Sequence, residues 1–346
     1  MTAAYRFDLP EHLIAQRPAP ERDGSRLMVL RGDGIEHRTF RDLPEILRPG
    51  DLLVLNETRV IAARLFGTRE TGGKAEVLLL RPSDRARYDP ASVHWLALAR
   101  PGRKLRDGAR ILFGDLGSAT VTAVHEDDGV RELAFDLNVP FETLLERAGK
   151  LPLPPYIHND TSDAQERYQT VFARTPGSVA APTASLHFTP ELFERLTARG
   201  VETTKLVLDV GLGTFRPMQS ERVDEHVMHA ESYLLPEATV AAIGSAKAEG
   251  RRVIAVGTTV ARALEGNIRT HGRLVAGDGE TDIFISPGFA FGAIDAMITN
   301  FHLPQSTLLV LVSALAGRER ILAAYAEAVA RGYRFFSFGD AMLIEP

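Results

Sequence analysis

The sequence predicts an α/β core, built on a largely parallel sheet or partial barrel, that is interrupted by an inserted antiparallel β domain. Two changes in the pattern of predicted helices and strands along the chain indicate this arrangement. From about residue 187 onward helices and strands alternate, which favours a parallel sheet flanked by helices. Between residues 63 and 140, short strands rich in Val, Leu and Phe follow one another with turn signals between them, which is typical of a small barrel or sandwich.

The inserted domain is expected over residues 63–149, and the core over residues 1–62 and 150–346. Within the first core segment, strands are predicted at 26–31 and, after the turn signal Pro49-Gly50, at 51–56. The inserted strands are predicted at 75–80, 93–99, 109–113, 119–125 and 131–137, followed by a helix at 141–149. The proline-rich residues 151–155 suit neither a helix nor a central strand, so they mark the boundary.

The C-terminal half supplies the alternating elements of the core. Its predicted helices cover residues 190–199, 236–248, 258–269, 306–317 and 318–331. Its predicted strands cover residues 202–210, 252–256, 282–285, 296–301 and 333–338. The helix at 258–269 is expected to be capped by its threonine pair. In such sheets ligands bind at the carboxyl ends of strands, so the residues that follow each strand are the candidates for a site.

The amino-acid composition excludes several classes of protein. The chain has 346 residues, 45% of them hydrophobic and 25% charged, as in ordinary globular proteins. It has no cysteine, which excludes disulfides, thiolate catalysis and Cys-based zinc sites. It shows neither a membrane-spanning run nor a signal-peptide pattern at its start, so a cytoplasmic enzyme is expected. The formal charge of −5 argues against general coating of nucleic acid, although residues 100–110 form a basic segment.

Two polar loops after predicted strands are the strongest candidates for an active site. Residues 208–217 approximate the glycine loop that holds S-adenosylmethionine in many methyltransferases, but Phe215 replaces the third glycine and Pro217 stands where a helix would begin. Close approach of a ligand to the backbone at Gly211 and Gly213 still fits. Residues 297–307 collect Asn, His, Gln, Ser and Thr between two apolar elements, and alternation places Asn300 and His302 on one face, opposite Phe301.

Three further stretches contain polar residues that could bind a ligand or take part in catalysis. Thr258 and Thr259 follow Gly257 at a helix start, which suits a carboxylate or phosphate. Alternate positions in an extended segment would place Thr183, Ser185 and His187 on one face. Asp340 follows Gly339 at the end of the last predicted strand.

The histidine-rich residues 225–231 raise the alternative of a metal site. His and Glu can ligate zinc, but neither an extended nor a helical segment brings His226, His229 and Glu231 together on one face. We therefore favour a hydrogen-bonded pair of His229 and Glu231, which would serve acid–base chemistry or positioning, over a metal site.

Taken in order, these motifs resemble the S-adenosylmethionine:tRNA ribosyltransferase-isomerase family of queuosine biosynthesis. The resemblance rests on seven segments between residues 168 and 343, and two N-terminal segments extend it over nearly the whole chain. The seven are residues 168–173, 181–189, 210–217, 226–231, 256–259, 298–308 and 335–343. The N-terminal residues 7–10 and 56–60 look like that family too, and the resemblance is thinnest in the β insert.

The resemblance implies both a fold and a reaction. The family fold is an α/β barrel-like core with an inserted antiparallel β-barrel domain. The family transfers the ribosyl part of S-adenosylmethionine to 7-aminomethyl-7-deazaguanine at the wobble position of tRNA, giving epoxyqueuosine and releasing adenine and methionine. The implied partners are S-adenosylmethionine and tRNA carrying the deazaguanine precursor, with no membrane, and we expect a monomer. S-adenosylmethionine is then a consumed substrate, and neither a cofactor nor a metal is expected.

This chemistry suggests roles for the candidate residues. The sulfonium acidifies the neighbouring ribose methylene, so a base must remove a proton there, and departing adenine needs an acid or hydrogen-bond donors. The catalytic candidates are His187, His229, Glu231, His302 and Asp340, and the sequence does not choose among the three histidines. The substrate-binding candidates are Thr183, Ser185, Asp209, Gly211, Gly213, Phe215, Arg216, Thr258, Thr259, Asn300 and Gln305. Among them, Arg216 or the helix start at Thr258 would hold the methionine carboxylate, and Phe215, like Tyr168 and Phe172, would stack on a purine.

Two alternatives remain open on the sequence alone. The first keeps the S-adenosylmethionine site but transfers to a small-molecule acceptor. The second is a non-catalytic RNA-binding protein that uses residues 100–110. A pure binding module does not need polar residues concentrated in several loops after strands, which argues against the second.

Overall fold

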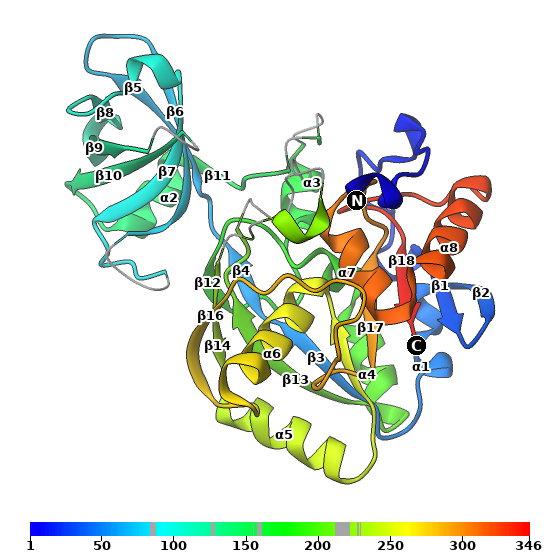
Figure 1. The fold of residues 1–346 in the computed structure, drawn as a ribbon. Coiled ribbons are helices and arrows are strands. Elements are labelled where there is room, and N and C mark those ends of the chain that lie inside the picture. Colours follow the sequence, from blue (N-terminus) through cyan, green and yellow to red (C-terminus); the bar gives the residue numbers. More distant parts are fainter. Residues whose placement is uncertain are drawn as a thin grey trace.

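The chain forms a larger α/β core and a smaller β-barrel, which stands apart from the core at the upper left of Figure 1. This architecture comes from a computed structural model that describes residues 1–83, 88–125, 129–154, 156–157, 161–211, 222–226, 228 and 230–346. The chain enters the barrel after β4 (Thr58–Val60) and leaves it at β11 (Gly149–Lys150). The predicted fold class, an α/β core with an inserted antiparallel β-barrel, is confirmed.

A nine-stranded sheet forms the centre of the core. Its order is β16 (Gly277–Thr281), β14 (Glu231–Leu235), β13 (Glu202–Leu208), β3 (Leu52–Asn56), β15 (Val253–Val256), β17 (Ala296–Asn300), β18 (Ala341–Ile344), β1 (Arg26–Arg31) and β2 (Gly34–Thr39). The four strands β13, β3, β15 and β17 are mutually parallel. Antiparallel pairs occur at β14–β13, β14–β16, β17–β18 and β1–β2, so the sheet is mixed rather than largely parallel.

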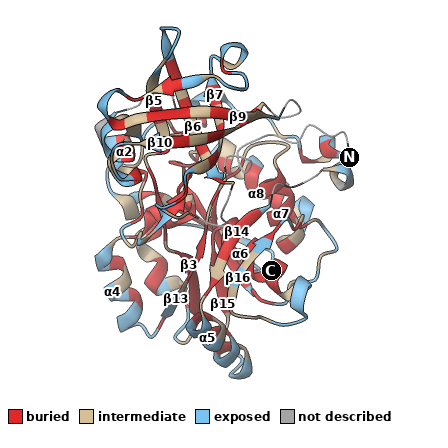
Figure 2. Cartoon of the chain, turned by 90° about the vertical axis from the view of Figure 1, so that its left-hand side faces the viewer, coloured by how far each residue is buried: buried red, intermediate tan, exposed pale blue. Residues whose placement is uncertain are grey.

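The central strands of this sheet are buried on both faces, as Figure 2 shows. Alternate residues of one strand enter different clusters: Val253 and Ala255 pack on one face, Ile254 and Val256 on the other. The first cluster includes residues of α5 (Glu237–Ala248), α6 (Thr258–His271), α7 (Thr307–Ala316) and α8 (Arg318–Ala330). The second includes residues of α1 (Leu43–Ile46) and α4 (Pro190–Ala198). Burial on both faces explains why these strands are apolar runs without alternation.

The barrel is closed by hydrogen bonding between β5 and β8. Its six strands, in order around the barrel, are β5 (Arg64–Arg69), β6 (Lys74–Pro82), β7 (His94–Arg100), β10 (Val130–Leu137), β9 (Gly117–Val124) and β8 (Arg110–Leu112). Helix α2 (Phe141–Ala148) packs against the barrel core, where the rings of Phe141 and Trp95 stack at 5.1 Å. The short β11 extends the sheet beside β5.

Several predicted elements shift or change type. The strand predicted at 282–285 lies instead at β16, and the strand predicted at 333–338 is the later β18. Residues 183–187 form a 3₁₀ turn instead of an extended segment. Strand β12 (Thr175–Ser178) pairs with β4, and helix α3 (Ser162–Arg167) precedes it; neither was predicted. No helix in the described part of the chain combines the length and the apolar character needed to cross a membrane.

Candidate active site

A polar cavity lies at the carboxyl ends of the central parallel strands. The space between its lining atoms amounts to about 490 Å³, a value that includes its opening to solvent. The loops after β15 and β17, and Val210 beyond β13, line it. Residues before β18 line it too, because β18 runs antiparallel to β17 and so begins where β17 ends, with Ala341 paired to Asn300.

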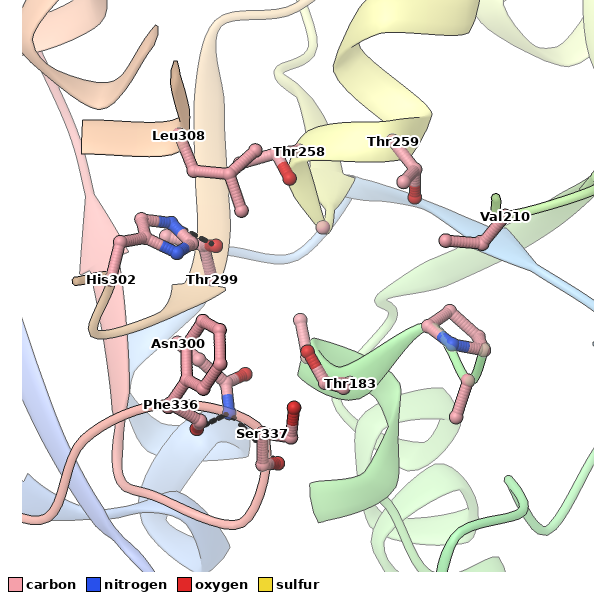
Figure 3. A pocket seen from close by; sticks show the side chains of 14 residues that line it. Thr183, Val210, Thr258, Thr259, Thr299, Asn300, His302, Leu308, Phe336 and Ser337 are labelled. Carbon is pink, nitrogen blue, oxygen red and sulfur yellow. Dashed lines mark hydrogen bonds between the residues drawn. The ribbon is translucent and has the colours of Figure 1, made fainter. Parts of the chain in front are cut away.

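The N-terminus of α6 forms one wall, as Figure 3 shows. Gly257 precedes the helix with a φ of +102°, a conformation that favours glycine, and its N–H donates to the Ile298 carbonyl at 2.8 Å. Neither Thr258 nor Thr259 caps the helix, so the predicted capping is wrong. Both threonines line the cavity, and the helix dipole favours an anionic group beside them.

His302 forms the opposite wall, in the loop after β17. Its Nε2 lies 3.1 Å from Thr299 Oγ1, and its backbone N–H donates to the Tyr325 hydroxyl at 2.9 Å. Burial lowers the pKa of His302 to about 3, so the ring is neutral near pH 7. The predicted placement of Asn300 and His302 is confirmed: both line the cavity, whereas Phe301 packs against Tyr325 in the core.

Asn300 connects this wall to the segment before β18. Its Nδ2 donates to the carbonyls of Phe336 at 2.9 Å and Ser337 at 3.3 Å (Figure 3). The other amide atom, Oδ1, and the Ser337 hydroxyl are buried without a hydrogen-bond partner among the described residues. Both atoms have a polar neighbour inside the protein, the His187 ring for Asn300 and the Tyr156 hydroxyl for Ser337, and small shifts of these side chains would pair them.

The 3₁₀ turn at residues 183–187 separates three candidates that the sequence placed together. In a turn of about three residues, side chains two apart point in different directions, unlike those of a strand. Thr183 lines the cavity, whereas Ser185 is fully buried and its hydroxyl has no partner in the described part of the structure. The predicted shared face of Thr183, Ser185 and His187 is therefore wrong.

His187 lies beside a neighbouring hollow rather than in the cavity itself. Its Nδ1 is 2.6 Å from Ser25 Oγ, and its ring stacks on Phe40 at 4.9 Å. Burial lowers the pKa of His187 to about 4, partly opposed by Asp340 and by the nearby Asn300 amide. Although Asn300 is near enough to affect the pKa, the Nε2 atom of His187 forms no hydrogen bond of normal geometry within the described residues.

Two candidate carboxylates are held in ion pairs. Glu231, at the start of β14, pairs with the buried Arg262 of α6. Asp340 accepts from the Arg26 side chain at 2.9 and 3.1 Å and from the backbone N–H groups of Arg26 and Arg334. It precedes β18 instead of following a strand, which corrects its predicted position.

The remaining candidates lie around the cavity or outside the described residues. The Asp209 carboxylate lies against Gly177, where an added Cβ would meet Oδ1 at 2.7 Å. Gln305 has a positive φ of 56° and donates its backbone N–H to the Tyr5 carbonyl at 3.0 Å. Gly211 is described, and it does not line the cavity. Gly213, Phe215, Arg216 and His229 lie outside the described residues.

The structure also adds lining residues that the sequence analysis did not select. The apolar ones are Ala181, Pro182, Ala184, Val210, Leu308 and Phe336, and nothing in their local pattern distinguishes them from core residues. The polar ones are Thr299 and Ser337, which lie close to the candidates Asn300 and Asp340 in the sequence. The apolar side chains give the cavity an apolar surface beside its hydroxyl, amide and imidazole groups, as in most small-molecule sites.

The cavity can accept a molecule that carries an anionic group, polar ring atoms and an apolar surface. An anionic group would bind at the α6 N-terminus, and a neutral imidazole is available opposite it. Among the described residues, no group of three or more His, Cys, Asp or Glu side chains is arranged to hold a metal ion.

Comparisons with known proteins agree with this description. Residues 2–344 match the family described as queuosine biosynthesis protein. A relative from Gloeobacter violaceus, named S-adenosylmethionine:tRNA ribosyltransferase-isomerase, is 53% identical over 100% of this chain and 96% of its own length. A relative of the same name from Symbiobacterium thermophilum is 56% identical over 98% of both chains.

A solved structure extends the similarity to three dimensions. The crystal structure of S-adenosylmethionine tRNA ribosyltransferase from Thermotoga maritima is 39% identical, covers 99% of both chains and superposes with a TM-score of 0.56. Identity above 50% along nearly the full length of several relatives shows common ancestry throughout, the β-barrel included. The chain belongs to the queuosine biosynthesis protein family, and its relatives from Gloeobacter violaceus and Symbiobacterium thermophilum are named S-adenosylmethionine:tRNA ribosyltransferase-isomerases.

Proposed function

We propose that this protein transfers and isomerises the ribosyl moiety of S-adenosylmethionine onto 7-aminomethyl-7-deazaguanine at the wobble position of tRNA. The product is epoxyqueuosine-tRNA, and adenine and methionine are released. Full-length identity of 53–56% to relatives named for a ribosyltransferase-isomerase activity carries the proposal. S-adenosylmethionine and tRNA are both substrates in this scheme, and the protein needs neither a metal nor a resident cofactor.

The cavity suits the charges of S-adenosylmethionine. The methionine carboxylate would bind at the N-terminus of α6, where Thr258 and Thr259 add hydroxyl donors to the free N–H groups. The Asn300 amide and the Ser337 hydroxyl, which line the cavity, would hydrogen-bond the adenine or ribose. Apolar contacts with Val210, Leu308 and Phe336 would exclude water from the reacting atoms.

His302 is our candidate for the group that moves protons. A base first removes a proton from the methylene beside the sulfonium, and the electron pair of that C–H bond stays on carbon, stabilised by the positive sulfur. Adenine then leaves with the electron pair of its glycosidic C–N bond and takes up a proton, and methionine leaves with the pair of the C–S bond. The acceptor nitrogen forms a C–N bond to the ribosyl carbon skeleton and loses a proton. A neutral imidazole can accept the methylene proton, and donation of Nε2–H to Thr299 would leave Nδ1 as the basic nitrogen.

Burial makes His302 a weak base in the free protein, and the substrates would change this. A substrate phosphate beside the ring would favour the protonated imidazole and raise the pKa of His302, whereas the sulfonium would act in the opposite direction. His229 remains a second candidate, because it lies outside the described residues. Glu231 and Asp340, which bind arginines, are proposed to position the surrounding elements.

The test is a turnover assay with purified protein, S-adenosylmethionine and tRNA that carries the deazaguanine base. We expect adenine release that depends on this tRNA and is absent with tRNA that carries guanine at the wobble position. Adenine release without tRNA would indicate a small-molecule acceptor. Binding of tRNA without adenine release would indicate a non-catalytic RNA-binding protein.

The role of His302 is tested in the same assay. His302→Gln is expected to lower kcat by at least about a hundredfold, the usual contribution of a general base, with little change in the KM for S-adenosylmethionine. His271→Gln removes an exposed histidine at the end of α6 and is the matched control. A His302→Gln enzyme with normal kcat would assign the proton transfer to another group.

A further inference from the structure

A second hollow, next to the candidate active site, is lined by three arginines. Arg22, Arg167 and Arg334 come from the N-terminal segment, from α3 and from the segment before β18. The hollow encloses about 270 Å³, including its opening to solvent. Ser337 lines both this hollow and the active-site cavity, so the two are adjacent. We call this second hollow the arginine hollow.

Backbone carbonyls hold the three guanidinium groups in place. Arg22 Nη1 donates to the Leu186 carbonyl at 3.2 Å and to the Arg167 carbonyl at 3.3 Å. The Arg167 side chain donates to the carbonyls of Ala19 at 2.9 Å and Pro20 at 3.1 Å. The Arg334 side chain donates to the Arg17 carbonyl at 3.2 Å. A carbonyl orients a guanidinium but does not neutralise its charge. Each arginine also keeps N–H groups that these bonds do not use.

No carboxylate in the described part of the chain accepts a hydrogen bond from any of these three side chains. Asp340 Oδ1 lies 3.9 Å from Arg334 Nε, too far for a hydrogen bond, and Asp340 already binds Arg26. Burial and the neighbouring Arg167 both lower the pKa of Arg22, and Glu166 only partly opposes them. Three cations are thus gathered with little compensating negative charge.

A buried imidazole lies beside the same three arginines. His187 lines the arginine hollow and is only 5% exposed. Its Nδ1 lies 2.6 Å from Ser25 Oγ, and the Ser25 hydroxyl donates to the Arg22 carbonyl at 3.4 Å, so these contacts lie inside the protein. An oxyanion in the hollow would therefore be bound by the guanidinium groups.

We propose that the arginine hollow binds a phosphate of the RNA backbone beside the nucleotide whose base is modified. This inference rests on the proposed function, since it needs a tRNA substrate. Guanidinium groups match phosphate oxygens in pairs, and phosphate contacts set the register of a nucleic acid on a protein. The methionine carboxylate of S-adenosylmethionine is the other possible oxyanion, but the open hollow and its three cations fit a solvent-exposed backbone better than a single carboxylate.

The test compares Arg167→Gln and Arg334→Gln with the wild type and with Arg195→Gln, which removes an exposed arginine of α4. Dissociation constants for tRNA are measured over a range of salt concentrations without S-adenosylmethionine, and KM values are measured for both substrates. We expect each hollow variant to weaken tRNA binding about tenfold and to reduce the slope of log Kd against log salt by about 0.7 to 1. The KM for S-adenosylmethionine should stay within about twofold of the wild type, and Arg195→Gln should match the wild type throughout.

The other outcomes overturn the proposal in distinguishable ways. A raised KM for S-adenosylmethionine with unchanged tRNA binding would place the methionine carboxylate in the hollow. Normal values for both substrates in folded variants would make the hollow structural. Should Arg167→Gln fail to fold, Arg334→Gln still decides, because its side chain makes a single hydrogen bond to the backbone. Wild-type protein that neither binds tRNA nor releases adenine would instead refute the proposed function itself.

Discussion

The buried histidine His302 should make the protein less stable in acid, with a magnitude that follows from its pKa. Its pKa is about 3 in the folded state because burial disfavours the charged ring, against 6.5 for an exposed histidine. As pH falls below 6.5, the unfolded chain binds a proton that the folded chain does not. The free energy of unfolding therefore falls by about 1.4 kcal/mol per pH unit in this window, until pH approaches the folded pKa.

Between about pH 7.5 and about pH 5, this linkage amounts to a loss of about 2 kcal/mol from His302 alone. His187, with a folded pKa of about 4, should contribute a second loss of about 2 kcal/mol over the same range. Typical proteins have only about 5–15 kcal/mol of stability, so an effect of this size is readily measured.

Urea unfolding of wild type, His302→Gln and the exposed-site control His271→Gln at several pH values measures the effect. Whatever its stability at neutral pH, His302→Gln should lose about 2 kcal/mol less than the wild type on acidification. The control should follow the wild type. Parallel curves for His302→Gln and wild type would refute the reasoning, because they would mean that His302 titrates equally in both states.

Two further substitutions test, by equilibrium unfolding, the ion pairs formed by the buried carboxylates of Glu231 and Asp340. Glu231→Gln should lower the free energy of unfolding by about 3–5 kcal/mol, because it leaves the Arg262 charge buried without its partner. Asp340→Asn should lower it by about 1.5–3 kcal/mol, because hydrogen bonds from the Arg26 guanidinium to a charged acceptor become bonds to a neutral one.

An exposed ion pair provides the control for both substitutions. Glu249 pairs with Arg251 at 2.7 Å on the surface, and Glu249→Gln should change stability by less than about 1 kcal/mol. Losses as small as this for Glu231→Gln or Asp340→Asn would show that burial does not strengthen those pairs.

Much of the fold could be predicted because local patterns specify it. The bounds of β1 and α4 were predicted within one residue. An apolar run marks β1, and Pro190 and Gly200 mark the start and the end of α4. The last strand was placed too early. Residues 333–338 are as apolar as a strand, but Tyr333 and Phe335 pack against Phe301 in the core, and Phe336 takes a φ of +75° that no strand allows.

The candidate site, like the fold, could be predicted from the sequence only in part. The sequence by itself determined which polar residues follow the predicted strands. Four of them, Thr258, Thr259, Asn300 and His302, line the cavity, together with Thr183 from the segment predicted to be extended. Their composition and position in the chain were enough, because the carboxyl ends of parallel strands meet at one edge of a sheet.

Only the tertiary structure decided which histidine faces the cavity, and how the carboxylates are used. His187 and His302 are both buried, yet one lies against Ser25 and the arginines and the other beside Thr299. Glu231 and Asp340 meet arginines 31 and 314 residues away in the chain. Such pairings depend on strand order and direction, above all on β18 running antiparallel to β17, and no local pattern of residues encodes a contact over that separation.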